Sequence, residues 1–183
     1  MKTITLKDKT FELSYPSHQI QQDIARIADA INQDLAGMPA PLFIGVLNGA
    51  CLFAADLIRL INFTCEITFV KVSSYQGTAS TGEVTQLIGL NHVLSGRTVI
   101  LIEDIVDTGE TLAKLHKTFS ALNPYQIKVA TLLFKPNAYK GSLPVDYIGR
   151  SIPNEFIVGF GLDYDGLGRN LSDIYTLKGP SPK

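Results

Sequence analysis

The chain has 183 residues, of which 45% are hydrophobic and 18% are charged, a composition typical of one globular domain spanning residues 1–183. A net charge of −1 gives no electrostatic surface for nucleic acid. No apolar run approaches the roughly 20 residues that span a bilayer, and the amino-terminal residues lack a secretion signal. We therefore predict a cytoplasmic protein that binds neither nucleic acid nor a membrane, with Cys51 and Cys65 as buried free thiols.

The first third of the chain predicts a hairpin, a helix, and then a buried strand and a second helix. Residues 3–15 alternate in polarity and favour the hairpin. Ser17 is placed to cap a helix that has an apolar residue every three or four positions: Ile20, Ile24, Ile27, Ile31 and Leu35. Residues 42–47 predict a buried strand, and residues 51–61 predict a buried helix.

Strands continue to alternate with helices along the middle of the chain. The four aliphatic residues 99–102 suit a buried parallel strand, and a helix is predicted over residues 108–122. Residues 74–82 are small and polar, which is typical of a loop. Further strands are predicted over residues 65–72, 84–90, 127–134, 145–149, 156–160 and 173–177.

This order of elements predicts an α/β fold with a central, mostly parallel sheet flanked by helices. The core is expected over about residues 40–150, and a small hood from about residues 1–16 and 150–183. In such folds, ligands bind beyond the carboxyl ends of the strands. We therefore expect the loops that follow the strands to converge on one edge of the sheet, namely residues 48–50, 73–82, 103–111 and 135–137.

Two adjacent acids, Glu103 and Asp104, follow the buried aliphatic run and are costly there unless something binds them. A turn rich in threonine and glycine comes next, over residues 107–111, and it enters a helix whose first N–H groups suit a phosphate. Acids that bind hydroxyls beside a turn that binds phosphate predict a ribose 5-phosphate pocket. The alternative is an ordinary acidic helix start with Asp107 as its N-cap.

The segment 99–111 resembles the phosphoribosyl pyrophosphate (PRPP) binding motif of type I phosphoribosyltransferases, and residues 40–175 resemble the hypoxanthine-guanine phosphoribosyltransferases. The resemblance implies the type I phosphoribosyltransferase fold and an enzyme of purine salvage. It implies that hypoxanthine or guanine reacts with PRPP to give IMP or GMP and pyrophosphate, with Mg²⁺ as the cofactor. It also implies a homodimer or homotetramer.

The same resemblance assigns roles to the ribose phosphate segment. Glu103 and Asp104 hold the ribose hydroxyls and contribute to the metal site. The 5-phosphate lies on the turn formed by Asp107, Thr108, Gly109, Glu110 and Thr111. Asp107 is also the implied general base or acid at purine N7, a role suited to a carboxylate at the mouth of a pocket.

Pyrophosphate is implied to lie against two loops and an arginine. Asn48 and Gly49 match the first loop, which often contains a non-proline cis peptide in the family. The family commonly has lysine or arginine where Asn48 stands, so only backbone contacts carry over. Ser74 and Tyr75 match a pyrophosphate-contacting pair at the start of a mobile loop, and Arg169 has the fork geometry that fits phosphate oxygens. A plain turn, a flexible connection and a surface ion pair are the respective alternatives.

The base is implied to meet four residues near the end of the chain. Lys135 would donate to the purine O6, because an ammonium is a donor only. Phe156 would stack on the ring, and the Ile157 backbone would meet the base edge. Asp163 would bind Mg²⁺ directly or through water. A solvated lysine and a core phenylalanine are the alternatives for Lys135 and Phe156.

Two other functions stay open on the sequence alone. One is a phosphoribosyltransferase that prefers xanthine or another base. The other is a regulator on the same fold that senses nucleotides, which predicts a basic surface or an added DNA-binding domain.

Overall fold

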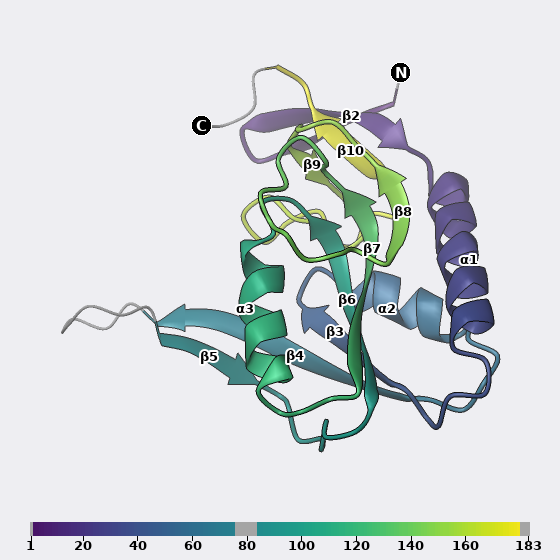
Figure 1. The fold of residues 1–183 in the computed structure, drawn as a ribbon. Coiled ribbons are helices and arrows are strands. Elements are labelled where there is room, and N and C mark those ends of the chain that lie inside the picture. Colours follow the sequence, from purple (N-terminus) through teal and green to yellow (C-terminus); the bar gives the residue numbers. More distant parts are fainter. Residues whose placement is uncertain (1, 76–83, 180–183) are drawn as a thin grey trace.

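A six-stranded sheet forms the centre of the protein, as seen in a computed structural model that describes residues 2–75 and 84–179 (Figure 1). The strand order is β5-β4-β3-β6-β7-β8. Five neighbouring strands are parallel and β5 runs antiparallel to β4, so the predicted fold class is confirmed. The strands are β3 (Leu42–Leu47), β4 (Glu66–Tyr75), β5 (Val84–Ile88), β6 (Thr98–Val106), β7 (Gln126–Phe134) and β8 (Tyr147–Ser151).

Helices cover both faces of this sheet. The helices α1 (Ser17–Asp34) and α2 (Cys51–Ile58) pack on one face, and α3 (Glu110–Ser120) packs on the other. Strands covered on both sides need apolar residues at every position. Residues 99–102 of β6 accordingly alternate between the two core clusters, and all four are fully buried.

A small antiparallel sheet forms the predicted hood at one end of the molecule (Figure 1). Its strands lie in the order β1-β2-β10-β9, with β1 (Thr3–Leu6), β2 (Lys9–Tyr15), β9 (Ile157–Val158) and β10 (Ile174–Leu177). Phe11, Val158 and Tyr175 form its buried core. That the whole chain is one domain stays a prediction.

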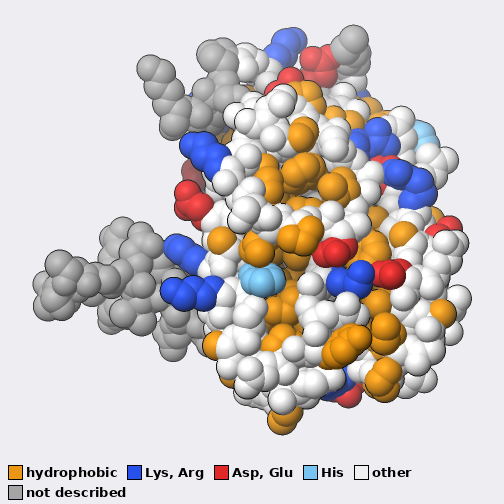
Figure 2. Space-filling model, in the orientation of Figure 1, with side chains coloured by type: hydrophobic (Ala, Val, Ile, Leu, Met, Phe, Trp, Pro, Cys, Tyr) orange, Lys and Arg blue, Asp and Glu red, His pale blue; other side chains and the backbone are white. Residues whose placement is uncertain are grey.

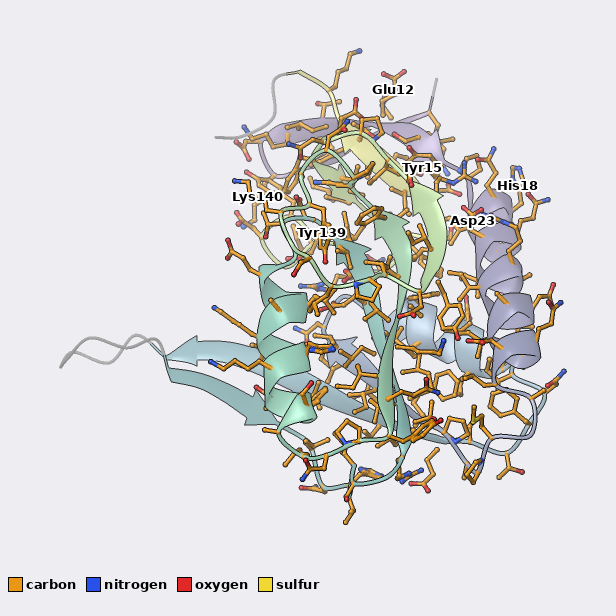
Figure 3. All side chains as sticks on the ribbon, in the orientation of Figure 1. Glu12, Tyr15, His18, Asp23, Tyr139 and Lys140 are labelled. Atoms are coloured by element: carbon orange, nitrogen blue, oxygen red, sulfur yellow. The ribbon has the colours of Figure 1, made fainter. Side chains whose placement is uncertain are left out.

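An arginine of β8 ties the hood to the body of the protein. The Nε of Arg150 donates a hydrogen bond to Oδ2 of Asp23 on α1 at 2.7 Å. Its guanidinium also lies 5.2 Å from the ring centre of Tyr15, the last residue of β2. Tyr15 and Asp23 are labelled in Figure 3, beside the start of α1. These contacts hold β2, α1 and β8, the last strand of the central sheet, together.

Several local predictions differ from the structure. The cap of α1 is Pro16 rather than Ser17, and the N–H of Ser17 donates instead to Oδ1 of Asp173 at 2.9 Å. A distant carboxylate thus satisfies the helix start, which no local pattern announces. The Cys51 side chain is exposed and that of Cys65 is partly exposed, so their predicted burial is wrong, although both are free thiols.

The described part of the chain also bears on the remaining predictions. Strand β6 continues to Val106, so Glu103 and Asp104 lie within the strand rather than after it. Ser74 and Tyr75 end β4, and most of the predicted loop, residues 76–83, lies outside the described residues. No helix within residues 2–75 and 84–179 is long and apolar enough to cross a membrane.

Candidate active site

A cavity of about 500 Å³ lies where the carboxyl ends of β3 and β6 meet. The chain passes from β3 to β4 on one side and later returns to β6 on the other side, which makes this the switch point of the sheet. Most of its lining residues come from the ends of β3 and β6 and the start of α3: Val46, Leu47, Gly49, Val72, Glu103, Asp104, Ile105, Val106, Asp107, Thr108, Gly109, Glu110, Thr111, Leu112 and Lys114. The predicted ribose phosphate segment therefore forms the main wall of one cavity.

The carboxyl groups at the floor of this cavity are those of Glu103, which is buried, and Asp104, which is partly buried. Burial raises the pKa of Glu103 well above its usual value, and the neighbouring Asp104 charge adds to the rise. Burial also raises the pKa of Asp104 to about 6, although backbone N–H groups and the charge of Arg169 act in the opposite direction. Both acids are thus costly to ionise in the protein alone, and hydroxyl donors or a cation would lower that cost.

The loop after β3 approaches Asp104 without any side chain in between. The Leu47–Asn48 peptide is cis, a feature that the sequence left open. A Cβ atom on Gly49 would lie 1.9 Å from Oδ2 of Asp104. Gly161, whose φ is +98°, faces the same loop, since a Cβ there would lie 2.1 Å from the Gly49 carbonyl oxygen. The absence of side chains at Gly49 and Gly161 therefore lets the loop between β9 and β10, the loop after β3 and Asp104 lie close together.

Replacing Gly49 with alanine is expected to weaken the PRPP binding that the sequence predicts by about tenfold or more, because the added methyl group must displace the Asp104 carboxylate. Isothermal titration calorimetry with PRPP and Mg²⁺ measures the effect. Gly37→Ala is the control, because it adds a methyl group at a positive φ with no atom within 4 Å. Equal PRPP affinity in Gly49→Ala and the wild type would contradict this account of Asp104.

The turn before α3 lines the cavity with residues 107–111. The helix cap is Gly109, with φ +87°, and no side chain makes a cap hydrogen bond to this helix start. Only a long contact of 3.4 Å joins the N–H of Glu110 to the Thr108 hydroxyl. The alternative of Asp107 as a simple N-cap is therefore wrong. A helix start that lines a cavity and has no side-chain cap suits an anion.

Asp107 contacts Lys135 instead. The Lys135 ammonium donates to Oδ2 of Asp107 at 2.7 Å, and only 9% of the Lys135 side chain is exposed. Lys135 follows β7, and its backbone N–H donates to the Val106 carbonyl at 3.0 Å. The alternative of a solvated lysine is thus wrong, and this ion pair joins two residues predicted for opposite halves of the site.

Asp163 and Arg169 form an ion pair of their own above Gly161. The Arg169 guanidinium lies 2.5 Å from Oδ1 of Asp163 and donates to the Gly161 carbonyl at 2.6 Å. The N–H of Gly166 donates to Oδ2 of Asp163 at 2.7 Å. Neither residue lines the cavity, yet both charges act on Asp104. The pair therefore lies close to the acid floor without forming part of it.

The remaining predicted residues lie outside the cavity lining. The Phe156 ring packs in the hood, with its centre 6.2 Å from that of Phe11 and 6.0 Å from that of Tyr164. Ile157 is buried in β9. Ser74 and Tyr75 pair through their backbones with β5. Their roles toward the base and pyrophosphate stay predictions, as does that of the exposed Asn48.

Two further residues at or near the cavity, Lys114 and Tyr139, are not among the residues that the sequence predicts for the site. Lys114 lines the cavity one helical turn after Glu110, and the spacing of four residues indicates that both lie on one side of α3. Tyr139 contacts Gly109, although 30 residues separate them along the chain. The spacing of four residues from Glu110 could have indicated Lys114 from the sequence. The contact between Tyr139 and the turn depends on the fold and has no local sequence pattern.

Known proteins share this sequence pattern. The family model described as phosphoribosyl transferase domain matches residues 15–165. The hypoxanthine-guanine phosphoribosyltransferase of Mycobacterium tuberculosis (strain ATCC 25618 / H37Rv) is 42% identical over 167 residues, which cover 88% of this chain and 83% of that protein. The protein of the same name from Staphylococcus aureus (strain N315) is 38% identical over 168 residues, which cover 91% and 93%.

Solved structures share the fold as well. A hypoxanthine phosphoribosyltransferase from Staphylococcus aureus matches with a TM-score of 0.83 at 38% identity and covers 91% of each chain. A hypoxanthine-guanine phosphoribosyltransferase from Bacillus anthracis, solved with a HEPES molecule in the active site, matches with a TM-score of 0.83 at 36% identity and covers 91% of this chain and 98% of that one.

A parallel sheet with an acid pair and an uncapped helix start at its switch point defines the class of a type I phosphoribosyltransferase. The chain belongs to the phosphoribosyltransferase family, within the group of the hypoxanthine-guanine phosphoribosyltransferases that it resembles in sequence and fold. This membership favours a transferase over the nucleotide-sensing regulator that the sequence left open.

Proposed function

We propose that the protein transfers the 5-phosphoribosyl group of PRPP to N9 of hypoxanthine or guanine, which gives IMP or GMP and pyrophosphate. The observation that carries the proposal is the 2.7 Å ion pair between Lys135 and Asp107. The pair joins the lysine proposed to donate to the purine O6 with the carboxylate proposed to act at N7, and Asp107 itself lines the cavity. The names of the relatives support the same reaction.

PRPP would bind along the cavity with its ends on different elements. Its ribose hydroxyls would donate to Glu103 and Asp104, which offsets the cost of ionising these buried acids. Its 5-phosphate would accept hydrogen bonds from the backbone N–H groups of residues 108–111. Its pyrophosphate would face the cis peptide loop at Asn48 and Gly49, the backbone of residues 74–75, and Arg169.

Mg²⁺ fits the donor set of the cavity. No group of three metal-binding side chains gathers within residues 2–75 and 84–179. Mg²⁺ keeps several waters and is usually held by one or two carboxylates together with substrate oxygens, so Glu103 and Asp104 would hold it in the cavity, and Asp163, which lies outside the lining, would reach it directly or through water. The raised pKa values of Glu103 and Asp104, which burial causes, show that their ionised forms lack a compensating charge, and this favours a cation. When bound, Mg²⁺ would neutralise charge on the pyrophosphate.

The residues of the chain then account for the chemistry at the base. The Lys135 ammonium donates to the purine O6, which favours a 6-oxo base over adenine, whose 6-amino group is a donor. Asp107 exchanges a proton with N7 while N9 bonds to C1 of the ribose and the C1–O bond to pyrophosphate breaks. Phe156, Ile157 and Asp163 are proposed to meet the base from the β9 side.

One assay tests the proposed function directly. The protein is incubated with PRPP and Mg²⁺ and with hypoxanthine, guanine, xanthine or adenine in turn, and nucleotide formation is followed by chromatography. We expect IMP and GMP and no AMP. A preference for xanthine would replace the proposed base specificity, and no product from any base would overturn the enzyme itself.

Replacing Lys135 with alanine is expected to raise the KM for hypoxanthine by about tenfold to a hundredfold, because a charge-assisted hydrogen bond to O6 is lost. Steady-state kinetics at saturating PRPP measure the change. Lys117→Ala on α3 is the control, because Lys117 is exposed and lies outside the cavity lining. A KM that stays within twofold of the wild type would show that Lys135 does not read the base.

We also propose that the chain forms a homodimer or homotetramer. Figure 2 shows hydrophobic side chains gathered on one face of the molecule. Large hydrophobic side chains are exposed at several positions, including 70% of Tyr125 and 75% of Val93. Large exposed apolar areas are typical of protein interfaces. Size-exclusion chromatography with light scattering tests this, and a monomer at micromolar concentration would contradict it.

A further inference from the structure

The Tyr139 ring lies directly on the glycine of the phosphate turn. A Cβ atom on Gly109 would lie 2.4 Å from Cε2 and 2.9 Å from Cδ2 of Tyr139, so the ring occupies the space that a side chain would need. Gly109 has φ +87° and caps α3. The turn at this point has no side chain of its own to limit its movement. The Tyr139 ring supplies that limit from outside.

The ring itself is held in place by its surroundings. It meets the Phe134 ring edge to face, with 5.4 Å between the ring centres. Its hydroxyl donates to the Leu143 carbonyl at 2.6 Å. A Cβ on Gly141 would lie 2.5 Å from the same hydroxyl oxygen, so the backbone closes over it. Figure 3 labels Tyr139 and Lys140 near the amino end of α3.

The same segment carries Lys135. The N–H of Tyr139 donates to the Lys135 carbonyl at 3.1 Å, which closes a turn. This turn is bonded to the phosphate segment at both ends, because the N–H of Lys135 donates to the Val106 carbonyl at 3.0 Å and that of Lys140 to the Thr108 carbonyl at 3.1 Å. The Tyr139 ring therefore fills the space between the turn that carries Lys135 and the phosphate turn.

We propose that Tyr139 is a positioning residue that holds the phosphate turn at a fixed distance and orientation relative to Lys135. PRPP on the turn and the purine base at Lys135 would then be held at the relative position that the transfer needs. The inference rests on the proposed function. Tyr139 lies outside the cavity lining and acts through Gly109 and Lys135. The binding of the 5-phosphate by the turn and the hydrogen bond from Lys135 to the purine O6 thereby both depend on one aromatic ring outside the cavity lining.

Tyr139→Ala removes the ring and leaves Gly109 free to move into the space. We expect PRPP to bind about tenfold more weakly and the KM for hypoxanthine to rise several-fold, since small displacements of a binding group cost this much. Tyr139→Phe keeps the ring on Gly109 and loses only the bond to Leu143, so it should bind PRPP within twofold of the wild type. Calorimetry measures the PRPP affinity, and steady-state kinetics measure the KM values.

A purely structural role is distinguished by Leu115→Ala. Leu115 is buried on α3 in the same core cluster as the Tyr139 contacts, and it lies outside the cavity lining. This variant should lower the melting temperature at least as much as Tyr139→Ala while its PRPP affinity stays near that of the wild type. If both variants weaken PRPP binding equally, or if Tyr139→Ala binds PRPP within twofold of the wild type, the positioning role is refuted.

The test also separates this inference from the proposed function. A wild-type protein that binds PRPP but makes no nucleotide contradicts the proposed reaction, and the calorimetric comparison of the Tyr139 variants still decides the positioning role. An active wild type with a Tyr139→Ala variant of equal affinity contradicts the positioning role alone. If Tyr139→Ala does not fold, Tyr139→Leu, which keeps part of the volume without the flat ring, is judged by the same criteria.

Discussion

Asp107→Asn is expected to lower kcat for hypoxanthine by about 10²–10⁴-fold, which is the usual contribution of a positioned acid or base. Asparagine keeps the size of the side chain and an acceptor for the Lys135 ammonium, 2.7 Å away in the wild type, but it cannot take up a proton. The KM for PRPP should change little, because the phosphate turn contributes backbone N–H groups. Steady-state kinetics with both substrates measure the two effects.

A purine analogue provides the matched control for Asp107. In 7-deazahypoxanthine a carbon replaces N7, so no proton can be exchanged there. The wild type and Asp107→Asn should therefore turn this base over at similar rates. If the substitution slows both bases by the same factor, Asp107 does not act at N7. A kcat for hypoxanthine within threefold of the wild type would lead to the same conclusion.

Asp104→Asn is expected to stabilise the protein and to weaken PRPP binding at the same time. Burial raises the pKa of Asp104 to about 6, so the ionised carboxylate destabilises the folded protein at neutral pH. The shift from 3.8 to about 6 is roughly two pKa units, and one unit corresponds to about 1.4 kcal/mol, so removal of this cost should raise Tm at pH 8 by several degrees. PRPP affinity should fall at least tenfold, because a neutral amide accepts weaker hydrogen bonds from the ribose hydroxyls and binds cations less well than a carboxylate.

The pH dependence of the wild type follows from the same group. An acid whose pKa is raised in the folded state contributes stability below its unfolded pKa and loses it as the pH rises through about 6. Without PRPP, Tm should therefore increase as the pH falls from 7 to 5, while PRPP affinity decreases over the same range. Calorimetry at several pH values measures both trends. Asp29→Asn, at an exposed position of α1, should keep both trends, and Asp104→Asn should weaken them and leave the contribution of Glu103.

The floor of the site could be predicted from the sequence because its signal is local. Four aliphatic residues followed by Glu103 and Asp104 indicate a buried strand with costly charges, and the structure places both acids at the cavity. The glycine in the turn likewise marks the start of α3. These patterns involve residues that are adjacent in the sequence, so they can be recognised without knowledge of the fold.

The partners of Asp107 and Gly109 could not be predicted in the same way. Asp107 has the composition of a helix cap, and only the pairing of β6 with β7 brings Lys135 to it across 28 residues. The cap of α1 is similar, since Asp173 reaches Ser17 from the far end of the chain. Long-range contacts of this kind depend on strand order and register, which local periodicity does not specify.

The pairing of β2 with β10 sets the order in which the site can be assembled during synthesis. Phe11 lies opposite Leu177, so the hood joins almost the first and last residues of the described chain. The hood strands hold the loop that carries Gly161, Asp163 and Arg169 against the β3 loop. A nascent chain that ends at residue 150 contains the acid floor and the phosphate turn in its sequence, but it lacks this loop. The contact between this loop and the β3 loop therefore forms only after the strands of the central sheet have been synthesised.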